Sequence, residues 1–136
     1  LKFRTYAILS DGECNEGSIW EAALLASAQK LNKLTIFVDY NKWQATGRSQ
    51  EIMSLEPLKE KWSSFGWDTI EIDGHNFDEI DNSLKILEQG SKPSAIIAHT
   101  IKGKGVSFME DNNNWHYKIP NEDELQSALE ELGMIS

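Results

Sequence analysis

The sequence predicts an α/β protein, in which a parallel sheet carries helices on both faces. Across the 136 residues, strand-like segments alternate with segments of helical periodicity, and such alternation is typical of a parallel sheet with crossover helices. Two expected strands, residues 5–10 (TYAILS) and 34–40 (LTIFVDY), are short, largely apolar runs. Such runs are typical of strands that are covered on both faces. We find no internal repeat and expect one domain over residues 1–136.

The first strand leads into an expected helix at about residues 16–31, with Asn15 as its cap. Its apolar residues recur at helical spacing and also occupy the remaining sides; they are Ile19, Trp20, Ala22, Ala23, Leu24, Leu25 and Ala26. A helix that is apolar nearly all round is buried. We therefore expect this helix to lie in the interior, and we regard it as the place to look for an interface.

The rest of the chain continues the alternation. A long polar loop over 41–56 precedes Pro57, which suits the first position of a helix over 58–65. We then expect strands over 67–72 and 94–100, an amphipathic helix between them, an irregular stretch from 102 to 120 and a last helix over 121–132. In that last helix, Asn121 and Glu124 have the spacing of a capping box.

Composition limits the possible partners. The formal net charge of −9 and the pI near 4.7 argue against binding to nucleic acid or to an anionic membrane surface. No apolar run approaches the ~20 residues of a membrane span, and no secretory signal is visible. The lone Cys14 excludes an internal disulfide framework and suits a reducing compartment, so we expect a cytoplasmic protein.

Two oxygen-bearing side chains follow neighbouring strands of the predicted sheet. Asp11 ends the first strand and Asn41 ends the next, and a right-handed crossover brings such strand ends together. A carboxylate and an amide carbonyl suit magnesium, while Gly12 allows a phosphate to approach the backbone closely. The residues alone leave an alternative open, because Asp-Gly is also a common turn and Asp11 could simply cap a helix.

The motifs around these residues resemble a known family. From Asp11 the chain reads D-G-E-x-x-E-G-x-x-W-E-A-A, and later V-D-Y-N-K-x-Q-x-x-G ending at Gly47. This pattern resembles the thiamin-diphosphate fingerprint of transketolases and of their split-subunit relatives. The later segments IDGHNFDEI, HTIKGKGVSFME and WH also fit that family, so the likeness spans nearly the whole chain. The resemblance implies the later part of a thiamin-diphosphate-binding domain that is incomplete at its N-terminus.

The resemblance also implies a cofactor site. Asp11 and Asn41 would ligate Mg²⁺, or Ca²⁺ or Mn²⁺ in its place, through their side chains, and Trp43 would do so through its main-chain carbonyl. Gly12 would donate its amide to the diphosphate, and Glu13 belongs to the same cofactor-binding turn. Position 10, usually glycine in the family, is a serine here, and its side chain could crowd the diphosphate turn.

Three further residues match catalytic positions of the family. Glu16 and Glu21 would join a proton-linked network across a dimer interface, and His116 would contact the donor substrate. Each position also has a structural interpretation. Glu21, as an acid in a buried helix, needs a partner or a raised pKa and could form an ion pair. Glu16 could favour the helix N-terminus, and His116 could be a surface residue.

By resemblance, the function would be transfer of a two-carbon ketol unit from a ketose phosphate to an aldose. A pyrimidine-binding domain or subunit would complete the enzyme as a dimer or heterotetramer, and the isolated chain would be inactive. Two alternatives are another thiamin-diphosphate enzyme, such as deoxyxylulose-phosphate synthase or a ketoacid dehydrogenase component, and a non-catalytic assembly module that retains the fold.

Overall fold

The computed structural model describes residues 3–135. Its contacts divide the chain into two compact units, Leu1–Thr100 and Ile101–Ser136, and each unit is described on its own. The single-domain organisation stays a prediction. Among the described residues, no helix has the length and apolar character needed to cross a bilayer.

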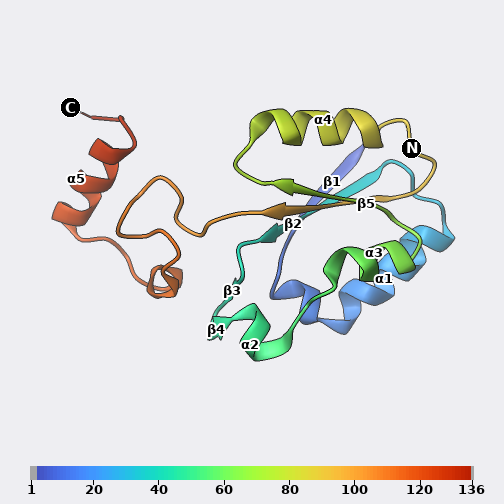
Figure 1. The fold of residues 1–136 in the computed structure, drawn as a ribbon, viewed down its shortest axis with the longest axis horizontal. Coiled ribbons are helices and arrows are strands. Elements are labelled where there is room, and N and C mark those ends of the chain that lie inside the picture. Colours follow the sequence, from blue (N-terminus) through green and yellow to red (C-terminus); the bar gives the residue numbers. More distant parts are fainter. Residues whose placement is uncertain (1–2, 136) are drawn as a thin grey trace. The chain divides into compact units, whose positions relative to one another are not determined.

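The first unit is built on a four-stranded parallel sheet in the order β1-β2-β6-β5 (Figure 1). The strands are β1 (Thr5–Ser10), β2 (Leu34–Tyr40), β5 (Asp68–Asp73) and β6 (Ser94–His99). All pairings are parallel, and the predicted α/β class is confirmed. Because Ser10 lies opposite Asp39, β1 and β2 end level with each other.

Helices cover both faces of the sheet. α1 (Gly17–Ala28) and α3 (Leu58–Ser64) lie on one face, and α4 (Phe77–Leu87) lies on the other (Figure 1). An aromatic cluster fills the first face, where the Trp62 ring lies 5.0 Å from those of both Trp20 and Trp67. The second core is smaller and joins α4 to β5 and β6; its buried residues are Ile72, Leu87, Ile96 and Ala98.

β1 differs from the expectation of a strand covered on both faces. Ala7 and Leu9 pack against the core beneath α1 and α3, but Tyr6 and Ile8, which point to the other face, are 49% and 76% exposed. The prediction was wrong because β1 is the edge strand and α4 packs over β5 and β6 at the far side of the sheet.

α1 also differs from the buried helix that its composition predicts. Ala23 and Ala26 face the core, whereas Leu24 and Leu25 are 58% and 61% exposed in this chain. The helix ends at Ala28, and Lys30 soon turns into the left-handed region with a φ of 52°. Asn15 does not cap it, because the N-cap is Glu16 and no side chain makes the capping hydrogen bond.

The segment 41–56, predicted as a loop, contains short regular elements. β3 (Trp43–Gln44) and β4 (Gly47–Arg48) form an antiparallel hairpin, and α2 (Ser49–Met53) follows directly. Strands of two residues are too short for a repeating apolar pattern, so periodicity could not reveal them. Pro57 is the N-cap of α3 and lies just before its first residue.

The second unit holds a short 3₁₀ helix, η2 (Asn113–His116), and α5 (Glu122–Glu131). The predicted capping box is confirmed, since the Asn121 and Glu124 side chains each accept a hydrogen bond from the other's main-chain amide. Before η2, Gly103 adopts a φ of 72°, and a Cβ there would lie 2.6 Å from the Met109 carbonyl oxygen. This turn therefore requires glycine.

Candidate functional site

The carboxyl ends of β1 and β2 form the candidate site. The register places Ser10 beside Asp39, so the residues that follow the two strands, up to Asp11 and Asn41, lie at the same carboxyl end of the sheet. In parallel sheets, ligands bind at the carboxyl ends of the strands. The structure thus supports the sequence-based expectation that the two oxygen-bearing side chains belong to one region, and their roles stay predictions.

Asp11 is the most buried acid of this region, with 1% of its surface exposed. Its Oδ1 accepts from the Gly12 amide at 2.8 Å, and its Oδ2 accepts from the Ser49 hydroxyl at 2.6 Å. Burial raises its pKa, the nearby Asp39 carboxylate adds to that, and the hydrogen bonds from Ser49 and Gly12 oppose it. These donors are neutral, so a bound cation would offset the cost of burying the charge.

Asn41 is held by its neighbours at the end of β2. Its Oδ1 accepts from the Trp43 amide at 2.9 Å, and its Nδ2 donates to Asp39 Oδ2 at 3.3 Å. The other oxygen of Asp39 accepts from the Thr100 hydroxyl. Next in the chain, the Arg48 guanidinium lies 3.7 Å above the Trp43 ring and joins the two strands of the hairpin. Contacts inside this chain therefore orient both the Asn41 side chain and the hairpin.

The donor set fits a hard cation. Asp11 and Asn41 offer a carboxylate and an amide oxygen, and Trp43 adds a main-chain carbonyl, which are the oxygen ligands that magnesium takes. In residues 3–135 no group of three or more His, Cys, Asp or Glu side chains could hold a metal ion. A site here would therefore need the amide, the main-chain carbonyl and oxygens from a bound ligand. The Asp11 carboxylate, buried and held by neutral donors, fits that need.

Gly12 is not required by the packing of this chain. Its φ of −61° is ordinary, and an added Cβ would meet Gln44 Cγ and Ser10 Oγ at 3.7 and 3.8 Å, which is normal contact. The fold therefore tolerates a larger residue here. A glycine at this position is consistent with a close approach by a ligand.

Ser10 and Glu13 form a reciprocal pair that sequence reasoning missed. The Glu13 amide donates to Ser10 Oγ at 3.1 Å, and the Ser10 amide donates to Glu13 Oε2 at 2.7 Å. The two bonds have the reciprocal pattern of a capping box, but they close the turn before the short 3₁₀ helix η1 (Glu13–Asn15), whose N-cap is Gly12. The spacing S-x-x-E was the available signal. It gives Ser10 a local role where the family usually has glycine, and it uses the Glu13 carboxylate to hold the turn.

The three predicted catalytic residues lie on exposed surface. Glu16 and Glu21 are exposed at the start and on the outer side of α1, so the expectation that Glu21 is a buried acid was wrong. Its side of α1 is not covered by any described part of the first unit. His116 ends η2 in the second unit, is exposed, and has its ring 4.6 Å from that of Tyr117. The roles of all three residues stay predictions.

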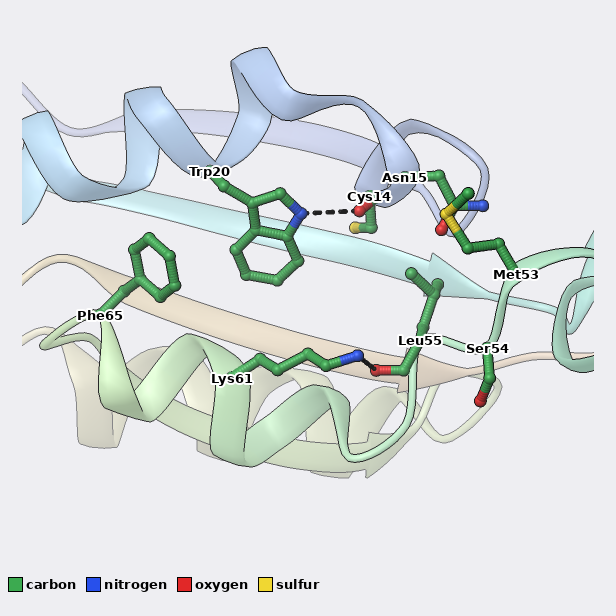
Figure 2. Close-up of a pocket in the computed structure, with 8 residues that line it drawn as sticks. All are labelled: Cys14, Asn15, Trp20, Met53, Ser54, Leu55, Lys61 and Phe65. Atoms are coloured by element: carbon green, nitrogen blue, oxygen red, sulfur yellow. Dashed lines mark hydrogen bonds between the residues drawn. The ribbon is translucent and has the colours of Figure 1, made fainter.

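A cavity of about 260 Å³ lies between α1 and α3, beside η1 (Figure 2). Trp20 and Lys61 line it from opposite helices, and each is anchored: Trp20 Nε1 donates to the Cys14 carbonyl at 2.8 Å and Lys61 Nζ to the Leu55 carbonyl at 2.6 Å. Burial, followed by the nearby carboxylates of Asp11 and Glu13, raises the pKa of Cys14 to about 12. Cys14 therefore stays a protonated thiol and is a poor nucleophile or metal ligand at neutral pH.

Comparison with known proteins decides the family. The family model described as the thiamine diphosphate binding domain of transketolase matches residues 1–136. The chain belongs to the transketolase family. It is 47% identical over 128 residues to the 6-deoxy-6-sulfo-D-fructose transketolase subunit SqwG of a Clostridium species, covering 93% of this chain and 46% of that protein. It is 38% identical to an apulose-4-phosphate transketolase subunit of Phocaeicola vulgatus, covering 96% of this chain and 47% of that protein.

Proteins named transketolase, without a subunit designation, are similar as well. Human transketolase is 32% identical over 130 residues, which is 96% of this chain and 20% of the human protein. The transketolase structure from Campylobacter jejuni superposes with a TM-score of 0.92 at 28% identity, covering 98% of this chain and 21% of that one. The chain thus spans about half the length of the relatives named as subunits and about a fifth of the human and Campylobacter jejuni transketolases.

Proposed function

We propose that this chain supplies the magnesium and diphosphate clamp of a transketolase that moves a two-carbon ketol unit from a ketose phosphate to an aldose. One observation carries the proposal: the buried carboxylate of Asp11, held by neutral donors, lies at the same sheet edge as Asn41. The family membership and the relatives named as transketolase subunits support the same chemistry.

The chain's own residues would bind and orient the cofactor. Asp11 and Asn41 would hold Mg²⁺ through side-chain oxygens, Trp43 through its carbonyl, and Gly12 would donate its amide to the diphosphate. When bound, thiamin diphosphate would supply a thiazolium carbon that acts as an electron sink. Because the chain carries a net charge of −9, the metal would also screen the diphosphate from the protein's negative charge.

A complementary polypeptide would complete the enzyme. Three relatives are named as single subunits of a transketolase, which supports a separate pyrimidine-binding subunit in a dimer or heterotetramer. The exposed side of α1, with Leu24 and Leu25 beside Glu21, suits such a contact. Glu16 and Glu21 would then join a proton-linked network across the interface, and His116 would contact the sugar-phosphate donor.

Cofactor titration tests the clamp. Mg²⁺ and thiamin diphosphate are titrated calorimetrically into the chain together with its complementary subunit, using wild type and Asp11→Ala. We expect the substitution to weaken binding at least a hundredfold, since it removes a ligand and its charge. Asp81→Ala is the matched control, because Asp81 is an exposed acid on α4 that pairs with Lys85. Cofactor binding that is insensitive to Asp11→Ala would refute the clamp.

Reconstitution tests the activity. We expect the isolated chain to show no ketol transfer and the mixture with its complementary subunit to show it. Comparing a ketose phosphate with pyruvate as the donor separates a transketolase from other thiamin-diphosphate enzymes. Full activity from the chain alone, or a mixture that accepts pyruvate and no ketose phosphate, would contradict the proposal.

A further inference from the structure

Hydrogen bonds through Ser49 tie the segment 42–49 to Asp11. The Ser49 hydroxyl donates to Asp11 Oδ2 at 2.6 Å, and the Ser49 amide donates to the Lys42 carbonyl at 3.1 Å. Ser49 thus joins the two ends of the β3–β4 hairpin and attaches them to the Asp11 carboxylate. Because the hairpin carries Trp43 and follows Asn41, the same contacts link the other two predicted oxygen donors to Asp11.

The hydrogen bond between Ser49 and Asp11 is buried. Ser49 and Asp11 are each 1% exposed, so their hydrogen bond is shielded from water. A hydrogen bond from a hydroxyl to a buried carboxylate is charge-assisted and strong, and it directs one oxygen of the carboxylate. Ser49 is the first residue of α2, yet its hydroxyl bonds Asp11, a residue 38 positions away, instead of the helix backbone.

The backbone at Lys42, just before the hairpin, is strained. Lys42 has a φ of 69°, in the left-handed region that residues with side chains seldom adopt. Lys42 directly precedes the hairpin, and its carbonyl accepts from the Ser49 amide at 3.1 Å. Strain of this kind persists when the surroundings determine the geometry, and it is common beside functional sites.

We infer that Ser49 is a positioning residue of the clamp: it orients the Asp11 carboxylate and anchors the hairpin that presents Trp43, without itself touching the metal. The inference rests on the proposed function, because it concerns the same site. Groups that hydrogen-bond a metal ligand fix its orientation, and their loss commonly weakens metal binding by about 10–100-fold.

Metal affinity distinguishes this role from a purely structural one. Free Mn²⁺ is measured by electron paramagnetic resonance while Mn²⁺ is titrated, with thiamin diphosphate present, into the chain assembled with its complementary subunit. We expect Ser49→Ala to weaken Mn²⁺ binding about 10–100-fold. Ser49→Thr keeps the hydroxyl, and we expect it to bind within about threefold of wild type.

Ser83→Ala is the matched control. Ser83 is also buried, and its hydroxyl donates to the Ile80 carbonyl at 2.8 Å within α4, on the other face of the sheet. We expect it to lose stability without losing Mn²⁺ affinity. Far-UV circular dichroism at the titration temperature verifies that each variant is folded. If Ser49→Ala does not fold, Ser49→Cys replaces the hydroxyl by a weak donor, and the same loss of at least tenfold is expected.

The outcomes separate the two proposals. If Asp11→Ala abolishes Mn²⁺ binding while Ser49→Ala, or Ser49→Cys in its place, binds within twofold of wild type, the clamp stands and the positioning role of Ser49 is refuted. An equal loss of affinity in Ser83→Ala also refutes it, because the effect would then follow from lost stability. Retained binding in Asp11→Ala refutes the proposed function, and the role of Ser49 falls with it.

Discussion

The two faces of strand β1 differ in whether other parts of this chain cover them. On one side, Ala7 and Leu9 pack on a core that α1 and α3 close with aromatic rings. On the other side, Tyr6 and Ile8 are 49% and 76% exposed, and β1 is an edge strand without a charged residue, a proline or a bulge to protect it.

This difference separates what the chain forms by itself from what would depend on a partner. The carboxyl end of β1, with Asp11 and its donors, is assembled from residues that all lie in the first unit. The open side of β1 and the outer side of α1 present apolar residues that nothing described in that unit covers. We expect the clamp to form with the fold of the chain, and the open surfaces to be covered on assembly.

The largest expected loss of stability is on the closed side of the sheet, the face that α1 and α3 cover. Trp62 is almost fully buried, and its ring lies 5.0 Å from two other tryptophan rings. Trp62→Ala should lower the free energy of unfolding by about 3–5 kcal/mol, because it leaves a large cavity. Urea denaturation followed by circular dichroism measures this, with the exposed Phe77→Ala as control. A loss below about 1 kcal/mol would mean that this core is loosely packed.

A matched pair of isoleucines compares the two sides directly. Ile97 is fully buried on the closed side, and Ile8 is 76% exposed on the open side. Ile97→Ala should cost about 2–5 kcal/mol in the chain alone, whereas Ile8→Ala should change stability by no more than about 0.5 kcal/mol. Sedimentation with the complementary subunit should then show weaker assembly for Ile8→Ala. Equal losses of stability in the two variants would contradict the comparison.

Substitutions of Ser10, in the turn that carries Asp11, should lower the stability moderately. Ser10→Ala removes the hydroxyl that accepts from the Glu13 amide and should cost about 1 kcal/mol, as loss of a helix cap does. Ser10→Gly restores the residue usual in the family and should cost a few tenths of a kcal/mol, because glycine is tolerated at caps. Thermal unfolding compares the two. If Ser10→Ala is as stable as wild type, the hydrogen bonds between Ser10 and Glu13 contribute nothing measurable.

The smallest expected effect is a gain in stability, from substitution of Asp11. Burial raises the pKa of Asp11, so the folded chain binds this proton more readily than the unfolded chain. The cost of burying its charge is full above the raised pKa and disappears as the pH falls below the ordinary value of 3.8. Without metal, Asp11→Asn should therefore raise the melting temperature by a few degrees at pH 7.

The gain from Asp11→Asn should shrink as the pH is lowered, because the wild-type carboxyl group then becomes neutral as well. Calorimetric melting curves of the metal-free chain between pH 4 and pH 8 measure this. A variant that is less stable than wild type at pH 7 would mean that the hydrogen bonds of Asp11 outweigh its desolvation.

The sequence predicted the strands that carry the site but not the contacts that support it. The strands 5–10 and 34–40 were predicted with their observed bounds, and their parallel direction follows from the alternation of strands and helices. The contact between Ser49 and Asp11 could not be predicted, because the two residues lie 38 positions apart and Ser49 follows a hairpin too short for a periodic pattern. The pairing of Ser10 with Glu13 was readable from its spacing and was missed.

The sequence alone determined the fold class, the strand ends that bear Asp11 and Asn41, and the family, because periodicity and motifs are local properties of the chain. Only the tertiary structure decided which apolar side chains are exposed to solvent. Whether Ile8 or Leu24 is covered depends on which elements reach each face, and a helix such as α1 is apolar nearly all round whether or not a neighbour lies against it. Burial is a property of the assembled surfaces, so it could not be read from the composition of one segment.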